Sequence, residues 1–443
     1  MVREPRDSAS PSLRRFATSD QGFVRGRILA VTLVEERFGT SWVHMKHPAN
    51  SSSWPAIRQF RNKLRVLAAV LCAGAATFGS NAAENWMFST AVALPSPINL
   101  PGTMSGTPWL SSDGLTLYFA SNRPGGYGKF DLWVATRNTT DENWGEPVNL
   151  GPSINTSAAE LMPCLSADGL TLYFGDGNPF GWTARNGTSE NYQIWTATRD
   201  NLHSPWSSAN DLGPPVGTKY IESYPHVSRD GLSLFFTSTR PGLPGLYVAR
   251  RATPSDPWLA PIGLGSKVNQ GSWTGFPFLS NDGLRLLCYS DRAGGQGGYD
   301  LWMSSRSSLA DEWLVPVNLG AQVNSSFYDL SPCVSADFPA LGSSLLFARN
   351  DANEWNEHIK IYGAVVIPKV SVLRSGSVNG PWNLVLTATF SPLSARRFQC
   401  EVPVVSVGGT TVFYQITKET GGSIQIESLE LVGRKIRLDY TIE

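Results

Sequence analysis

The sequence predicts an all-β protein, a five-bladed β-propeller followed by a small β-rich C-terminal module. Three observations lead to this prediction. The pattern Pro-x-Leu/Val-Ser-x-Asp-Gly occurs in five copies, a short apolar run follows each copy, and the segment before the first copy supplies a piece that the last copy lacks. Among 443 residues, Gly (42), Pro (30) and Trp (15) are abundant and charged residues make up only 16%. This composition is typical of many short strands joined by tight turns.

The five copies are spaced at a distance that suits one four-stranded propeller blade each. The aspartates of the pattern are Asp113, Asp168, Asp230, Asp282 and Asp337, so that successive copies start 52 to 62 residues apart. Internal repeats with such a period indicate a propeller or a solenoid. In the fifth copy Phe338-Pro339 replaces the glycine, which makes that turn irregular.

Each copy can be divided into four strands, A to D. Strand A is the Pro-x-Leu-Ser piece, and Asp-Gly then forms a tight turn because glycine tolerates positive φ and aspartate can bond its own backbone. Strand B is the apolar run, a Gly-rich loop follows it, and strand C comes next. Strand D carries a tryptophan and then Pro-x-Asn-Leu-Gly or a variant. The expected D strands are residues 144–150, 206–212, 258–264 and 313–319.

The fifth copy has no strand D after its strand C. A matching piece lies before the first copy, at residues 86–99. A strand from the N-terminal side would complete the last blade and close the ring, which removes both open sheet edges. Five blades over residues 84–367 follow from this count. A six-bladed ring is the alternative, although its sixth blade would have to come from a C-terminal segment that lacks the pattern.

The string from Ser111 to Trp133, Ser-Ser-Asp-Gly-Leu-Thr-Leu-Tyr-Phe-Ala-Ser-Asn-Arg-Pro-Gly-Gly and onward to Asp-Leu-Trp, resembles the WD40-like Pro-Asp repeats of TolB-type bacterial propellers. The resemblance covers residues 84–367, nearly two thirds of the chain. It implies an exported propeller that binds a partner, and it does not imply catalysis. A fold resemblance does not name the ligand.

The two ends of the chain differ from the repeat region. Residues 1–44 show no clear period and precede Met45, so we expect them to be upstream, non-structural sequence. Residues 45–83 contain a basic stretch, a short apolar run and small residues at 80–83, the pattern of a cleaved signal peptide. An uncleaved membrane anchor is the alternative. Cleavage predicts a periplasmic, cell-surface or secreted protein without a transmembrane span. Residues 368–443 alternate like strands and form the predicted C-terminal module.

Composition also limits the partners and cofactors. Lys+Arg and Asp+Glu both number 36, so no excess positive charge points to nucleic acid. Cys164, Cys288, Cys333 and Cys400 lack the spacing of a zinc site, and Cys164 and Cys333 occupy the same repeat position. We expect these two to be small buried residues, with a disulfide between them as the alternative. No metal or other cofactor is expected, and the chain is expected to be a monomer.

Candidate site residues lie next to strand A. The loop from strand D to the next strand A has the form Asn-x4-acid before the second and fifth copies, with Gly217 at the Asn position of the third and Thr274 at the acid position of the fourth. This loop should lie on one rim near the central channel. The variable residue after the proline of strand A should lie close to the axis. The candidate ligand-binding residues are therefore Asn155, Glu160, Glu222, Asn269, Asn324, Asp329, Trp109 and His226. The alternative for the loop residues is that they bond loop backbone, and for Trp109 and His226 that they fill the core.

Two functions follow from these patterns. The main hypothesis is a non-catalytic exported scaffold that binds an envelope protein or glycan at the channel mouth. The alternative is a propeller-type glycoside hydrolase or lyase that uses Glu160, Glu222 or Asp329, since sugar hydrolysis needs two carboxylates at a defined separation. The repeated Asp of each Asp-Gly turn is expected to be structural. Arg123, Arg240 and Arg292 are expected to cap loops or to pair with an acid in a neighbouring blade.

Overall fold

The structure is a computed structural model, and it describes most of the repeat region and the strands at both ends of the chain. The described residues are 27–34, 42–44, 86–177, 184–185, 192–242, 244–350, 358–368, 370–375, 383–385, 388–392, 397–403, 411–418, 424–432 and 435–442. The predicted signal peptide at 45–83 lies outside them, so its cleavage stays a prediction.

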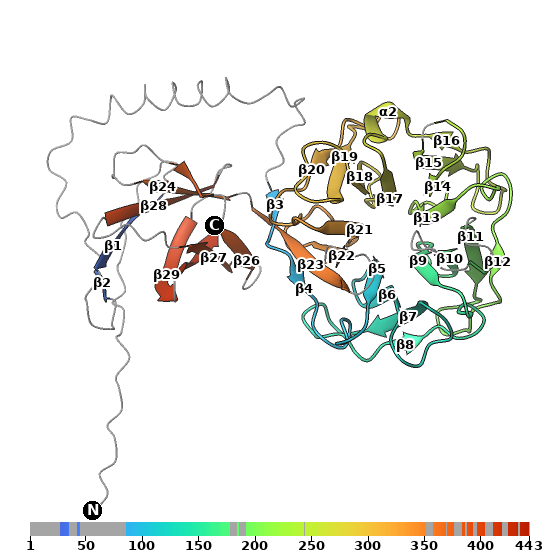
Figure 1. Cartoon of the computed structure of the whole chain (residues 1–443), viewed down its shortest axis with the longest axis horizontal. Helices are drawn as coiled ribbons and strands as arrows, with labels where there is room; N and C mark the ends of the chain where they lie inside the picture. Colours follow the sequence, from blue (N-terminus) through green and yellow to red (C-terminus); the bar gives the residue numbers. More distant parts are fainter. Residues whose placement is uncertain are drawn as a thin grey trace, which may run out of the picture.

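The repeat region forms a ring of antiparallel sheets, and one sheet contains each copy of the pattern (Figure 1). We call these sheets blades and number them by their copy. Blade 1 contains β5 (Ser105–Leu110), β6 (Thr116–Ser121), β7 (Asp131–Thr136) and β8 (Val148–Asn149); blade 2 contains β9 (Glu160–Leu165), β10 (Thr171–Asp176), β11 (Ile194–Thr198) and β12 (Asn210–Asp211). Blade 3 contains β13 (Glu222–Val227), β14 (Ser233–Ser238), β15 (Gly245–Arg250) and β16 (Ile262–Gly263); blade 4 contains β17 (Thr274–Leu279), β18 (Arg285–Ser290), β19 (Asp300–Ser305) and β20 (Val317–Asn318). The predicted β-propeller fold is therefore confirmed, while the number of blades stays a prediction with which these sheets agree.

The fifth blade is completed from the N-terminal side, as the sequence predicted. It contains β21 (Tyr328–Val334), β22 (Ser344–Asn350) and β23 (Ile359–Pro368), and β23 pairs with both β3 (Trp86–Phe88) and β4 (Val92–Ala93). Phe338, which replaces the turn glycine, is buried, and its ring lies 5.3 Å from Trp86 and 5.9 Å from Phe88. The irregular fifth turn thus supplies an apolar side chain against the strand that closes the ring.

The inner strands β5, β9, β13, β17 and β21 surround the axis, and each contains the same irregularity (Figure 1). The pairing register with strand B shifts in the middle of every strand A. One residue without glycine's freedom has a positive φ in each blade: Thr107, Met162, Tyr224, Phe276 and Ser331. A bulge of this kind bends a strand and increases its twist. Because it recurs in all five copies, we attribute it to the curvature of the ring.

The C-terminal part of the chain forms two further sheets. One has the order β2 (Trp42–His44), β1 (Arg27–Val34), β28 (Thr411–Lys418), β24 (Val370–Ser375), β25 (Asn383–Leu384). The other has the order β26 (Thr389–Pro392), β27 (Arg397–Pro403), β30 (Lys435–Ile442), β29 (Ile424–Val432). The expectation that residues 1–44 contain no regular structure is wrong at two places, since β1 pairs with β28 and with β2. Strand propensity in Arg27–Val34, which contains six β-branched or leucine residues, explains this pairing.

A short contact joins the ring to the second of these sheets. The Thr90 N–H donates to the Phe390 carbonyl at 2.8 Å, and the Phe390 N–H donates to Thr90 Oγ1 at 3.0 Å. Gln322 of the loop before β21 donates to the Ala388 carbonyl at 3.0 Å. This contact is made mainly by backbone groups.

The described residues contain little helix. They include the four-residue helix α2 (Gly265–Val268) but no helix long and apolar enough to cross a membrane.

Candidate functional site

The asparagines of the DA loops, which connect strand D of one blade to strand A of the next, join neighbouring blades. Asn155, Asn269 and Asn324 each accept the N–H and donate to the carbonyl of one residue of the preceding blade, at 2.8 to 3.1 Å. These backbone partners are Leu132, Leu246 and Leu301. The three side chains are at most 5% exposed. Each asparagine side chain thus bonds both backbone groups of one residue in the preceding blade, as a neighbouring strand would. Its amide is therefore unavailable to a ligand.

A fourth asparagine of this kind was not predicted from the sequence. Asn99 accepts the Ile361 N–H at 2.9 Å and donates to its carbonyl at 2.8 Å, which joins the fifth blade to the first. It lies six residues before Ser105, the first residue of β5, whereas Asn155 lies five residues before Glu160. This difference of one residue concealed it in the alignment of the copies.

The three carboxylates of the DA loops are also enclosed. Glu160, Glu222 and Asp329 have no exposed area, and each accepts the N–H and the hydroxyl of the Thr or Ser four residues earlier. Each also faces an arginine: Arg185 at 3.5 Å, Arg240 at 3.1 Å and Arg349 at 2.6 Å. The prediction of three carboxylates around an accessible rim is therefore corrected, because loop backbone and an arginine occupy their oxygens.

Burial changes the ionisation of two of these groups. It raises the pKa of Glu160 to about 7, and the hydrogen bonds from Thr156 and the charge of Arg185 oppose this rise. Burial also raises the pKa of Asp329, against the charge of Arg349. These shifts report the cost of enclosing a carboxylate.

Blades 1 and 4 have a hydroxyl where the other three have the acid. In blade 1, all three guanidinium nitrogens of Arg123 donate, to Ser121 Oγ and to the carbonyls of Pro97 and Ile98. In blade 4, Nη2 of Arg292 donates to the Val268 carbonyl and to Thr274 Oγ1 at 3.2 Å, while no partner among the described residues reaches its Nε or Nη1. The arginines therefore cap loops or pair with an acid of their own blade; the predicted pairing with a neighbouring blade does not occur in the described residues.

The opposite end of strand A offers open space. A cavity of about 80 Å³ lies on the axis at the face that carries the Asp-Gly turns, which we call the turn face. All five residues at the x position of Ser-x-Asp-Gly line this axial cavity: Ser112, Ala167, Arg229, Asn281 and Ala336. This position was not among the predicted site residues, although it varies within a strict pattern in the sequence.

Trp109, His226 and Phe278, which follow the proline of strand A, also line the axial cavity. Trp109 is partly exposed, and the rings of His226 and Phe278 lie 4.3 Å apart. Burial lowers the pKa of His226 to about 4, so its ring is neutral at neutral pH. Trp109 and His226 thus lie near the axis as predicted, and whether they bind a ligand stays a prediction.

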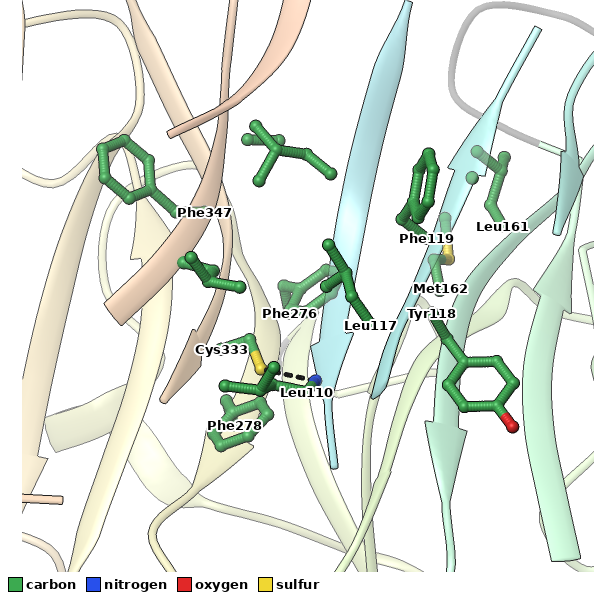
Figure 2. Close-up of a cluster of buried hydrophobic side chains, with 14 of the residues drawn as sticks. Leu110, Leu117, Tyr118, Phe119, Leu161, Met162, Phe276, Phe278, Cys333 and Phe347 are labelled. Carbon is green, nitrogen blue, oxygen red and sulfur yellow. Dashed lines mark hydrogen bonds between the residues drawn. The ribbon is translucent and has the colours of Figure 1, made fainter. Parts of the chain in front are cut away.

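Cys164 and Cys333 hold the same strand-A position in the other two blades. Cys333 Sγ accepts the Leu110 N–H at 3.2 Å (Figure 2), and Cys164 Sγ accepts the Val227 N–H at 3.3 Å. Both are buried and free, as are Cys288 and Cys400. The interpretation of small buried residues is confirmed; burial also raises the pKa of each of the two thiols to about 12.

The fold and these two faces define the chain as a β-propeller protein. Neither a family model nor a curated protein matches it. Similar solved structures include an α-L-arabinofuranosidase from Podospora anserina (13% identity, 64% of this chain and 96% of that one, TM-score 0.42) and one from Lactobacillus brevis (14%, 66% and 97%, 0.41). TolB from Acinetobacter baumannii is also similar (14%, 70% and 65%, 0.36). At such identities and TM-scores these similarities say nothing about the activity of this chain, and the TolB type stays a prediction.

Proposed function

We propose that the protein is an exported propeller that binds a glycan of the cell envelope at the axial cavity of the turn face. One observation carries this proposal: the positions that vary within the repeat converge on this cavity. An aromatic ring with neighbouring polar groups is a common arrangement for ligand recognition. Trp109 supplies the ring, and Ser112, Arg229 and Asn281 supply donors and acceptors for sugar hydroxyls. A cavity of about 80 Å³ takes part of one sugar ring, so the rest of a glycan would extend over the rim.

The proposal is tested by measuring glycan binding to the full chain with two kinds of variant. Trp109→Ala removes the ring, and Ser112→Trp fills the cavity from an exposed position without touching the core. We expect affinity to fall at least tenfold in both. Tyr127→Ala is the matched control, because it removes an exposed aromatic ring from the loop between β6 and β7, away from the turn face. Unchanged affinity in both turn-face variants would refute the proposed site.

Glycoside hydrolysis or lysis is the second candidate function. The observation in its favour is the Glu160 carboxyl, since a pKa of about 7 is the value that a general acid needs. A substrate would first have to displace Thr156 and Arg185 from this carboxyl. Incubating the same glycans with the full chain and assaying for new reducing ends distinguishes an enzyme from a binding protein. Activity that is lost in both Glu160→Gln and Glu222→Gln would favour the enzyme over the binding protein.

A further inference from the structure

A second cavity lies on the turn face, at the junction of blades 3 and 4. It has a volume of about 650 Å³, which is within the range of small-molecule sites. Its lining includes four arginines and two aspartates: Arg229, Arg250, Arg251, Arg306, Asp230 and Asp282. We call it the basic groove. Arg229 and Asn281 line both the basic groove and the axial cavity, so the two spaces adjoin.

The repeat itself shows which of these arginines the fold requires. Arg251 and Arg306 occupy a position that is also arginine in blades 1 and 2, where it donates to the glycine carbonyl of the Asp-Gly turn and stacks on a tryptophan. Arg251 and Arg306 do the same, with Nε–O distances of 2.7 and 2.9 Å and Trp258 and Trp313 below their guanidinium planes. These two arginines are structural, and their positions are fixed.

Arg229 and Arg250 have no such structural reason. At the position of Arg250, the last residue of strand C or its equivalent, the other blades have Thr136, Thr198, Ser305 and Val365. At the position of Arg229 they have Ser112, Ala167, Asn281 and Ala336. Both departures occur in blade 3, and both side chains line the same groove. Four other copies of the same architecture form without them.

The lining of the basic groove carries four guanidinium groups and two carboxylates. The Asp230 and Asp282 carboxylates each accept a serine hydroxyl and a backbone N–H of their own turn, and Asp282 also pairs with Arg285 at 3.2 Å. No described residue forms a hydrogen bond or ion pair with the guanidinium of Arg229 or Arg250. Burial lowers the pKa of Arg306, and the like charge of Arg250 lowers it further, while the charge of Asp311 opposes this shift.

We propose that the basic groove binds the anionic group of an acidic glycan, a saccharide that carries carboxylate or sulfate groups. Two fixed guanidinium groups and two that no described side chain pairs with line one space, and guanidinium planes bind carboxylate and sulfate oxygens in bidentate fashion. A bound anion would relieve the repulsion among the arginines. This inference deepens the proposed function and rests on it for the glycan. A saccharide that enters the axial cavity would reach the groove across Arg229.

The test compares the unchanged full chain with the Arg250→Thr variant, which introduces the residue found at this position in blades 1 and 2. Arg250 lines the groove but not the axial cavity, and it is exposed, so the substitution should leave the fold intact. Lys129→Thr is the control, since it removes the same charge from an exposed position outside both cavities. Calorimetry would use four probes: oligogalacturonate, which carries carboxylates only, a carrageenan oligosaccharide, which carries sulfates only, a neutral xylo-oligosaccharide of the same length, and inorganic sulfate.

We expect Arg250→Thr to weaken binding of one or both acidic oligosaccharides about tenfold at low salt, and to leave binding of the neutral probe unchanged. The Lys129→Thr protein should bind all four probes as the unchanged chain does. The two acidic probes distinguish a carboxylate from a sulfate ligand. Equal affinity of Arg250→Thr and the unchanged chain for both would overturn the inference, even if Trp109→Ala abolishes glycan binding. Sulfate binding that depends on Arg250, without any glycan binding, would support the anion site and refute the proposed function.

Discussion

The two faces of the propeller use their polar residues in opposite ways. On the face of the DA loops, the residues that recur from copy to copy, Asn155, Glu160 and their equivalents, are enclosed and bonded to loop backbone. On the turn face, the residues that differ from copy to copy line two open spaces. The two faces lie at opposite ends of strand A, which at six residues is about 20 Å long.

The contrast between the two faces separates the side chains that the blade geometry requires from those that it does not. A side chain that returns in the same place in each blade is explained by the geometry that the blades share, because each blade must bond its loops and its neighbour. A side chain that departs from the pattern, such as Arg250, is not needed for that geometry. Substitutions of the recurring DA-loop residues should therefore change stability, and substitutions of the turn-face residues that differ between blades should change binding.

The largest effect on stability is expected at Glu222. Glu222→Ala removes the carboxylate that accepts from Thr218, Ser238 and Arg240, and it leaves the Arg240 guanidinium, which is 13% exposed, without its anion. We expect the free energy of unfolding to fall by about 3 kcal/mol, the usual cost of breaking a buried pair from one side. Chemical denaturation measures this loss. Glu142→Ala, at an exposed glutamate, should change stability by less than about 0.5 kcal/mol; equal effects would contradict the contrast between enclosed and exposed acids.

A pH dependence of stability is expected from Glu160. Burial raises its pKa from an ordinary 4.5 to about 7, so between these values the folded protein binds the proton more strongly than the unfolded chain does. The resulting stabilisation is complete below pH 4.5 and is lost as the pH rises through about 7. In Glu160→Gln this decline should disappear, which thermal unfolding between pH 4 and 8 would show as a flatter profile. If the two profiles are parallel, the Glu160 carboxyl is not the group that titrates.

The all-β propeller and the N-terminal closing strand could be predicted from the sequence, because turn chemistry and alternation are local and each copy confirms the others. The site could not. Whether Glu160 faces solvent or its own loop depends on Thr156 and Arg185, and Arg185 lies outside the aligned pattern. The basic groove joins residues of different strands and blades, such as Arg250 and Asn281, and its shape depends on how two blades pack. Only the variation at its positions was visible in the sequence.

The smallest change in stability is expected at Thr274, which lies on the DA-loop face. In blade 4 the Arg292 guanidinium has two nitrogens without a partner among the described residues, and Thr274 holds the acid position. Thr274→Glu should supply the missing carboxylate and raise the free energy of unfolding by about 1 kcal/mol, which thermal unfolding would detect as a rise of about 2 °C in Tm. The Gln270 carbonyl would keep a donor, because Ser290 Oγ also reaches it at 3.2 Å.

A glutamate at the equivalent position of blade 1, residue 105, is expected to have the opposite effect on stability. Ser105 Oγ donates to the Ile98 carbonyl at 2.8 Å, and every nitrogen of Arg123 already has a partner. Ser105→Glu would place an acceptor against that carbonyl in a buried position, so it should destabilise the protein. A rise in Tm for Thr274→Glu together with a fall for Ser105→Glu would show that an acid is tolerated only where its arginine has nitrogens that no described residue reaches. If both substitutions lower Tm, the space around position 274, and not the two open nitrogens of Arg292, determines which residue blade 4 accepts.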